Sequence, residues 1–169
     1  MSKDIVNRVE KSKLISIDLE DYYISGERHQ IDLKDWLVDE LYLKEKEFRT
    51  AVKNHDWSKY KNAFVAIDCS NNAIIPPWAY MLISTQLSSH AKKTVIGSIT
   101  DLEAKIFEEE IEKIDLSIFK DKPVVIKGCS NKKLPMSLYY NLSSRLLPIA
   151  KSIMYGEACS AVPVFKRKA

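Results

Sequence analysis

The sequence contains few of the residues that build several common active sites. It has only 4 glycines in 169 residues, and no glycine-rich phosphate-binding loop occurs. No Gly-x-Ser-x-Gly nucleophile elbow is present. A cysteine phosphatase needs an arginine six residues after its cysteine to clamp phosphate, but this position after Cys129 is Pro135. These absences exclude P-loop hydrolases, serine hydrolases of the elbow type and cysteine phosphatases.

Long apolar runs and a strong charge imbalance are also missing. No stretch approaches the length that crosses a membrane, and residues 1–12 are polar, unlike a secretory signal. The net charge of +3 is small and dispersed, and the two short basic runs, Lys132-Lys133 and Lys166-Arg167-Lys168, are typical of a solvated surface. We therefore expect a cytoplasmic protein that binds neither membranes nor nucleic acid.

Cysteine is scarce, but its three occurrences share a pattern. Each is followed by serine, and both Cys69 and Cys129 open a Cys-Ser-Asn triplet after an apolar segment. The triplets lie 60 residues apart, and at this offset Leu87 also matches Leu147. The match predicts an internal repeat of strand, Cys-Ser-Asn, loop and helix. Because parallel strands end along one edge of a sheet, we expect Cys69 and Cys129 to end neighbouring strands with converging sulfurs.

The spacing of apolar residues predicts an α/β fold. Residues 63–68 form a nearly continuous apolar run, as in a buried parallel strand, and residues 63–155 give three successive βα units. We predict a three-layer architecture, a parallel or mixed sheet with helices on both faces. Residues 1–62 would add strands and a helix as an N-terminal extension of a βα repeat region, 63–169. No flexible linker separates the two parts, so we predict a single domain over 1–169.

The cysteines favour a metal site. Three thiols are an odd number, and in a reducing compartment clustered thiols act more often as ligands or nucleophiles than as disulfides. Thiolates of Cys69, Cys129 and Cys159 would suit zinc or an iron–sulfur cluster. The fourth ligand would be His55, at the end of a helix and on its inward face, or Glu157. The competing interpretation is a hydrogen-bonded core histidine, a solvated acid and cysteines that merely pack.

A second hypothesis makes Cys129 a nucleophile. Residues 124–133 resemble the active-site loop of rhodanese-type sulfurtransferases, in which a strand-end cysteine carries a persulfide. Lys132 and Lys133 would then stabilise its negative charge.

A third hypothesis is a non-catalytic interaction scaffold whose cysteines lie in the core. Trp78, Tyr80 and Met81 would then serve the core or a contact between two copies of the chain, so a homodimer is one expected form.

Six segments carry a family resemblance. They are Leu19-Glu-Asp21, Leu43-Lys-Glu-Lys46, Asn54-His-Asp-Trp-Ser58, Pro77-Trp-Ala-Tyr-Met-Leu82, Val125-Ile-Lys-Gly-Cys-Ser130 and Gly156-Glu-Ala-Cys-Ser160. Across nearly its whole length, the sequence resembles an uncharacterised bacterial family, domain-of-unknown-function family 2480. The resemblance implies no established activity and no catalytic residues. It implies gene neighbours among iron–sulfur cluster assembly components, and hence a metal-binding accessory role with those components as protein partners.

Overall fold

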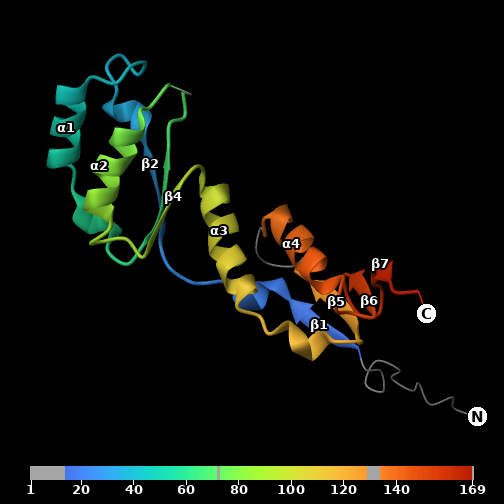
Figure 1. Ribbon diagram of the computed structural model, residues 1–169. Helices are drawn as coiled ribbons and strands as arrows, with labels where there is room; N and C mark the ends of the chain where they lie inside the picture. Colours follow the sequence, from blue (N-terminus) through green and yellow to red (C-terminus); the bar gives the residue numbers. More distant parts are fainter. Residues whose placement is uncertain (1–13, 72, 129–133, 169) are drawn as a thin grey trace, which may run out of the picture. The chain divides into compact units, whose positions relative to one another are not determined.

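The computed structural model describes residues 14–71, 73–128 and 134–168 (Figure 1). The chain divides into two compact units. Unit 2 is Ser25–Lys105, and unit 1 combines Met1–Ile24 with Ile106–Ala169. Unit 2 is therefore an insertion within the sequence of unit 1.

Unit 2 is a three-stranded parallel sheet with two α-helices. Its strands lie in the order β2-β3-β4. Val65 and Ile67, alternate residues of the central strand, share a buried cluster with Phe48 and Ile83 of the two helices. The elements in chain order are β2 (Arg28–Asp32), the 3-10 helix η2 (Leu33–Trp36), α1 (Glu45–Asn54), η3 (Trp57–Tyr60), β3 (Phe64–Asp68), α2 (Pro77–Leu87) and β4 (Lys93–Ile96).

Unit 1 has a four-stranded sheet in the order β1-β5-β6-β7. Its first two pairings are parallel, and the last strand runs antiparallel to β6. Val124 and Ile126 of β5 share a buried cluster with Phe107 of helix α3 and Leu142 of helix α4. The elements are β1 (Ile15–Asp18), η1 (Leu19–Tyr22), α3 (Ile99–Glu112), which begins in the sequence of unit 2, η4 (Leu116–Phe119), β5 (Pro123–Lys127), α4 (Met136–Leu146), β6 (Ser152–Tyr155) and β7 (Val162–Lys166).

The two units repeat one design at an offset of 59 residues. The succession β3, α2, β4 has the same element bounds as β5, α4, β6, shifted by 59. Hydrogen bonds repeat as well, because Gly97 donates its N–H to the carbonyl oxygen of Ile67 at 2.8 Å and Gly156 donates to that of Ile126 at 3.0 Å. The internal repeat predicted from the sequence is thus present in the fold.

The register of the repeat differs by one residue from the predicted 60. The buried Leu87 corresponds to the buried Leu146, whereas Leu147 is 43% exposed. The two Cys-Ser-Asn triplets match at 60 because Gly128 is one extra residue before Cys129. Aligning the two cysteines gives an offset of 60, whereas aligning the buried leucines of the two helices gives the offset of 59 that the fold has.

The expectation that Cys69 and Cys129 follow neighbouring strands is wrong. Cys69 follows β3 in the sheet of unit 2, and the strand before Cys129, β5, belongs to the sheet of unit 1. The reason is that residues before Trp36 supply a first strand to each sheet. The similar segments Ile17-Asp18-Leu19 and Ile31-Asp32-Leu33 place β1 beside β5 and β2 beside β3.

The α/β class and the mixed sheet predicted from the sequence are confirmed. The boundary expected at residue 62 falls inside unit 2, so the N-terminal extension and the repeat region are not the two units. Whether the units fold together as a single domain stays a prediction. In the described residues, every helix is too short or too polar to cross a lipid bilayer.

Candidate functional site

An apolar groove of about 720 Å³ opens in unit 1 between α4 and the strands β6 and β7. Gly128, directly after β5, and Tyr155, the last residue of β6, both line it, so it lies where parallel strands end. Ligands of open α/β sheets bind at such edges. Other large side chains of its wall include Met136, Tyr139, Tyr140, Met154, Val162 and Val164.

The wall of this groove exposes large apolar side chains to solvent. Met136 is 80% exposed and Tyr140 75%, both on the first turns of α4. Val162 and Val164, on β7, are each 59% exposed. A contiguous apolar patch of this kind marks a binding surface more often than a single exposed leucine does.

One side of the groove is fixed by Tyr139. Its hydroxyl donates a hydrogen bond to the carbonyl oxygen of Gly128, and its ring meets that of Tyr155 edge to face, with centroids 5.6 Å apart. Gly128 has a φ of +147°, and a Cβ there would lie 2.7 Å from Cδ1 of Leu134. A larger residue would be strained by this φ and would press against Leu134 and the hydroxyl of Tyr139, so glycine is favoured here.

Charged groups gather at the same end of the strands. Lys127, the last residue of β5, forms an ion pair with Glu157 at 2.7 Å. The hydrogen bond to Glu157 raises the pKa of Lys127 most, and the charges of Glu157, Asp18 and Cys159 raise it further. Asp18 ends β1, and Glu157 and Cys159 follow β6, so three neighbouring strands contribute to this edge.

Two predicted metal ligands, Glu157 and Cys159, therefore lie at one edge of unit 1. Cys159 is an exposed cysteine, and the side chain of Glu157 is 65% exposed. Cys129, with Lys132 and Lys133 of the sulfurtransferase hypothesis, lies outside the described residues.

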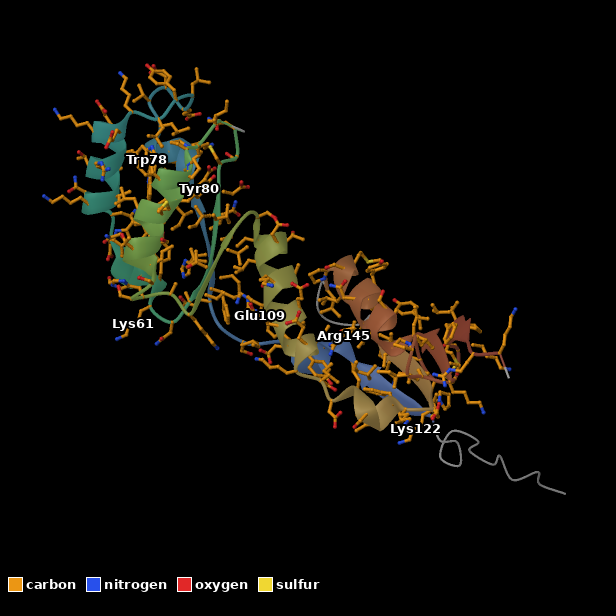
Figure 2. The ribbon with its side chains drawn as sticks, in the orientation of Figure 1. Lys61, Trp78, Tyr80, Glu109, Lys122 and Arg145 are labelled. Carbon is orange, nitrogen blue, oxygen red and sulfur yellow. The ribbon has the colours of Figure 1, made fainter. Side chains whose placement is uncertain are left out.

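Cys69 has a different setting in unit 2. It is 7% exposed, and its thiol donates a hydrogen bond to Oδ1 of Asn71 at 3.0 Å. Its backbone N–H donates to Oδ1 of Asp68 at 2.8 Å. Burial raises the pKa of the nearby Tyr80 (Figure 2), and the charges of Cys69 and Asp68 add to this effect. The surroundings of Cys69 suit a buried, hydrogen-bonded thiol.

His55 lies among aromatic rings of unit 2. Its Nε2 shares a hydrogen bond of 2.8 Å with the hydroxyl of Tyr60, and its ring centroid is 4.7 Å from that of Trp57. Burial lowers the pKa of His55 most and the charge of Lys59 lowers it further, while Asp56 acts in the opposite direction. The imidazole is thus biased toward its neutral form and takes part in aromatic packing.

The five predicted ligands are divided between the units. Cys69 and His55 belong to unit 2, whereas Glu157 and Cys159 belong to unit 1, as does Cys129 by sequence. Within the described ranges, no three His, Cys, Asp or Glu side chains are grouped as metal ligands would be. The complete ligand set, with Cys129, stays a prediction.

The apolar groove was missed in the sequence, although a signal exists. The buried stripe of α4 is Leu138, Leu142 and Leu146, and Met136 and Tyr140 form a second apolar pair four residues apart on another face. One helix with two apolar stripes indicates that one of them faces something other than the core.

Comparison with known proteins identifies a family. No curated protein and no solved structure matches the chain. The model of one family, described as "Protein of unknown function (DUF2480)", matches residues 3–167. The chain therefore belongs to the DUF2480 family.

Proposed function

We propose that the chain is a non-catalytic binding protein and that the groove of unit 1 holds its ligand, a small apolar molecule with an aromatic ring or an alkyl chain. The observation that carries this proposal is the groove itself, about 720 Å³ with mainly apolar and aromatic walls. Small-molecule sites have volumes of roughly 300–1,000 Å³ and similar linings.

A comparison of the two units supports a ligand site that is particular to unit 1. Tyr140 and Tyr155 correspond to Met81 and Ile96 of unit 2, which are also exposed, at 66% and 62%. The described part of unit 2 has no strand equivalent to β7, so it lacks the wall that β7 provides in unit 1. The added strand turns an exposed apolar face into a groove, which encloses a small molecule better than a flat surface does.

The expected affinity follows from the area that a ligand buries. Apolar surface contributes about 25 cal/mol per Å², so a ligand that buries roughly 300 Å² gains about 7.5 kcal/mol before the costs of association. This free energy corresponds to dissociation constants of micromolar order or weaker. Binding is therefore measured with micromolar probe.

The test uses N-phenyl-1-naphthylamine, an uncharged probe whose fluorescence rises in apolar surroundings. We expect saturable binding of one probe per chain, weakened at least tenfold by Tyr140→Glu, which places a carboxylate in the groove. Met81→Glu is the matched control, because Met81 is the equivalent exposed position of unit 2, and it should leave binding unchanged.

Two results would overturn the proposal. One is equal weakening by both glutamate variants. The other is a dimer in sedimentation velocity that binds no probe and becomes a monomer in Tyr140→Glu, since the groove would then be an interface between copies.

A metal site of zinc or iron, in an accessory role in iron–sulfur assembly, is the second candidate function. The observation that favours it is that Cys159 and Glu157 lie near Lys127, two residues before Cys129 in the chain. Such a site predicts stoichiometric metal in the purified protein by elemental analysis. The metal should be lost in Cys159→Ser, and its loss in Cys69→Ser would show that Cys69 also belongs to the site.

A further inference from the structure

A basic cleft of about 680 Å³ lies at the other end of the strands of unit 1. Asp121 precedes β5 by two residues, and Lys151 directly precedes β6. Lys166 ends β7 and pairs in register with Ser152, because β7 runs antiparallel to β6. The start of two strands and the end of a third therefore converge there. The lining residues are Asp121, Lys151, Lys166, Arg167 and Lys168.

Among the residues that the structure describes, the cleft carries more positive than negative charge. Its acid in that part of the chain, Asp121, already pairs with Arg167 at 2.7 Å. Among the described residues, Lys151, Lys166 and Lys168 form no ion pair. Several positive charges that line one cleft attract anions.

Arg167 organises the cleft. One guanidinium nitrogen binds Asp121, another donates to the carbonyl oxygen of Pro148 at 3.0 Å, and the backbone N–H donates to that of Lys151 at 2.9 Å. These bonds tie the end of the chain to the segments that lead into β5 and β6. The lysines on either side of Arg167 are thereby held near Lys151.

The same comparison between units shows what is particular to unit 1. Lys61 and Lys92 of unit 2 correspond to Lys120 and Lys151, so one pair of lysines is common to both units. Lys122, labelled in Figure 2, corresponds to an alanine, and the described part of unit 2 has no counterpart of β7 with its terminal cations. The added strand therefore also concentrates the charge of unit 1.

We propose that this cleft binds a small polyanion, a molecule with two or more phosphate or carboxylate groups. Three lysine ammonium groups beside a held guanidinium are donors for several anionic oxygens at once. The volume of about 680 Å³ is that of a small-molecule site. None of the five described lining residues is aromatic, so these residues offer no platform for stacking nucleic-acid bases. The proposal is independent of the apolar groove, which lies where β5 and β6 end.

The experiment is calorimetric titration of the full chain with tripolyphosphate at low ionic strength. We expect one ion per chain and an affinity that falls as salt is added, because screening weakens exposed charge interactions. The double variant Lys151→Gln/Lys166→Gln should bind at least tenfold more weakly. The matched control is Lys92→Gln, because Lys92 occupies in unit 2 the position that Lys151 has in unit 1. This variant should bind tripolyphosphate as the unaltered chain does. Since these side chains are exposed, the variants should keep the unfolding curve of the parent.

Further titrations separate the possible ligands. Citrate in place of tripolyphosphate distinguishes carboxylate from phosphate recognition, and binding of either one that depends on Lys151 supports the proposal. It is overturned if neither ion binds, or if Lys92→Gln weakens binding as much as the double variant does. Tighter binding of a short single-stranded DNA, with several chains per strand, would instead assign the cleft to nucleic acid and also overturn it.

Discussion

Asn62 and Asp121 occupy the same turn in the two units, 59 residues apart. Both have positive φ, 59° and 55°. Asn62 donates its backbone N–H to the carbonyl oxygen of His90 at 2.8 Å, and Asp121 donates to that of Ile149 at 3.0 Å. Asn and Asp tolerate the left-handed region better than other residues with a side chain. Each unit therefore uses the same turn to lead from a 3-10 helix into a strand that has a neighbour on both sides.

The register of 59 predicts which leucine of α4 supports the core. Leu146 is fully buried and Leu147 is 43% exposed. Leu146→Ala should lower the free energy of unfolding by about 2–5 kcal/mol, because it leaves a cavity, whereas Leu147→Ala should cost under about 1 kcal/mol. Urea unfolding of both variants checks this. Equal losses would contradict the register, and Leu87→Ala in unit 2 should resemble Leu146→Ala.

Local structure was accessible from the sequence because its signals are local. The apolar run at residues 63–68 and the proline that opens the next helix correspond to β3 (Phe64–Asp68) and α2 (Pro77–Leu87). The partner of each strand was not accessible, since β1 pairs with β5 across the whole of unit 2. Pairings between distant segments depend on packing that no short pattern encodes.

For the candidate sites too, the residue types could be read from the sequence, but their arrangement in space could not. Glu157 and Cys159 were identified by residue type, but their nearness to Lys127 arises from strand order in unit 1. The apolar groove was missed because the residue types of Met136 and Tyr140 do not show whether these side chains pack in the core or face solvent. Their exposure is a property of the folded unit, which places a different stripe of α4 against the sheet.

Gly128 and Gly156 form a pair that separates backbone strain from crowding. Both have positive φ, 147° and 111°, but a Cβ on Gly128 would lie 2.7 Å from Leu134, whereas the nearest atom to one on Gly156 is 3.8 Å away. Gly156→Ala should cost about 1–2 kcal/mol from strain, and Gly128→Ala a further ~1–3 kcal/mol from overpacking. Urea unfolding measures both. A larger loss for Gly156→Ala would contradict the described wall of the groove.

His55 predicts a loss of stability in mild acid. Burial, and then Lys59, lower the pKa of its imidazole in the folded chain. The unfolded chain, with a pKa of about 6.5, therefore takes up the proton first as the pH falls. The contribution of His55 to stability is complete above roughly pH 6.5 and decreases as the pH falls through the lower folded pKa. His55→Gln should reduce the difference in unfolding free energy between about pH 7 and 5.

Two charged neighbours of His55 shift its pKa in opposite directions, and substituting each of them tests the prediction. Asp56 raises the pKa of His55 and Lys59 lowers it. Asp56→Asn should therefore move the imidazole titration, followed by NMR, to lower pH, and Lys59→Gln should move it to higher pH. A titration midpoint of His55 at or above that of an unfolded histidine would show that burial does not govern this group.

The cysteines should differ in reactivity, because their exposures differ. Cys159 is exposed, whereas Cys69 is buried and its thiol donates to Asn71. In the purified protein near neutral pH, Cys159 should alkylate with iodoacetamide at least ten times faster than Cys69, as read by peptide mass spectrometry. A denatured sample, in which all thiols react alike, supplies the reference rate.

The same measurement decides between binding protein, metal site and sulfurtransferase. If no metal is held, a chelator should leave the rates of Cys69 and Cys159 unchanged. A metal-bound thiolate is protected by its ion, so slow reaction of Cys159 that becomes fast after chelation would assign it as a ligand and favour the metal function. Fast reaction of Cys129, far ahead of both others and insensitive to chelator, would favour a persulfide carrier. We expect that a chelator leaves both rates unchanged, because the thiol of Cys69 already has a hydrogen-bond partner within its own unit and Cys159 is exposed to solvent.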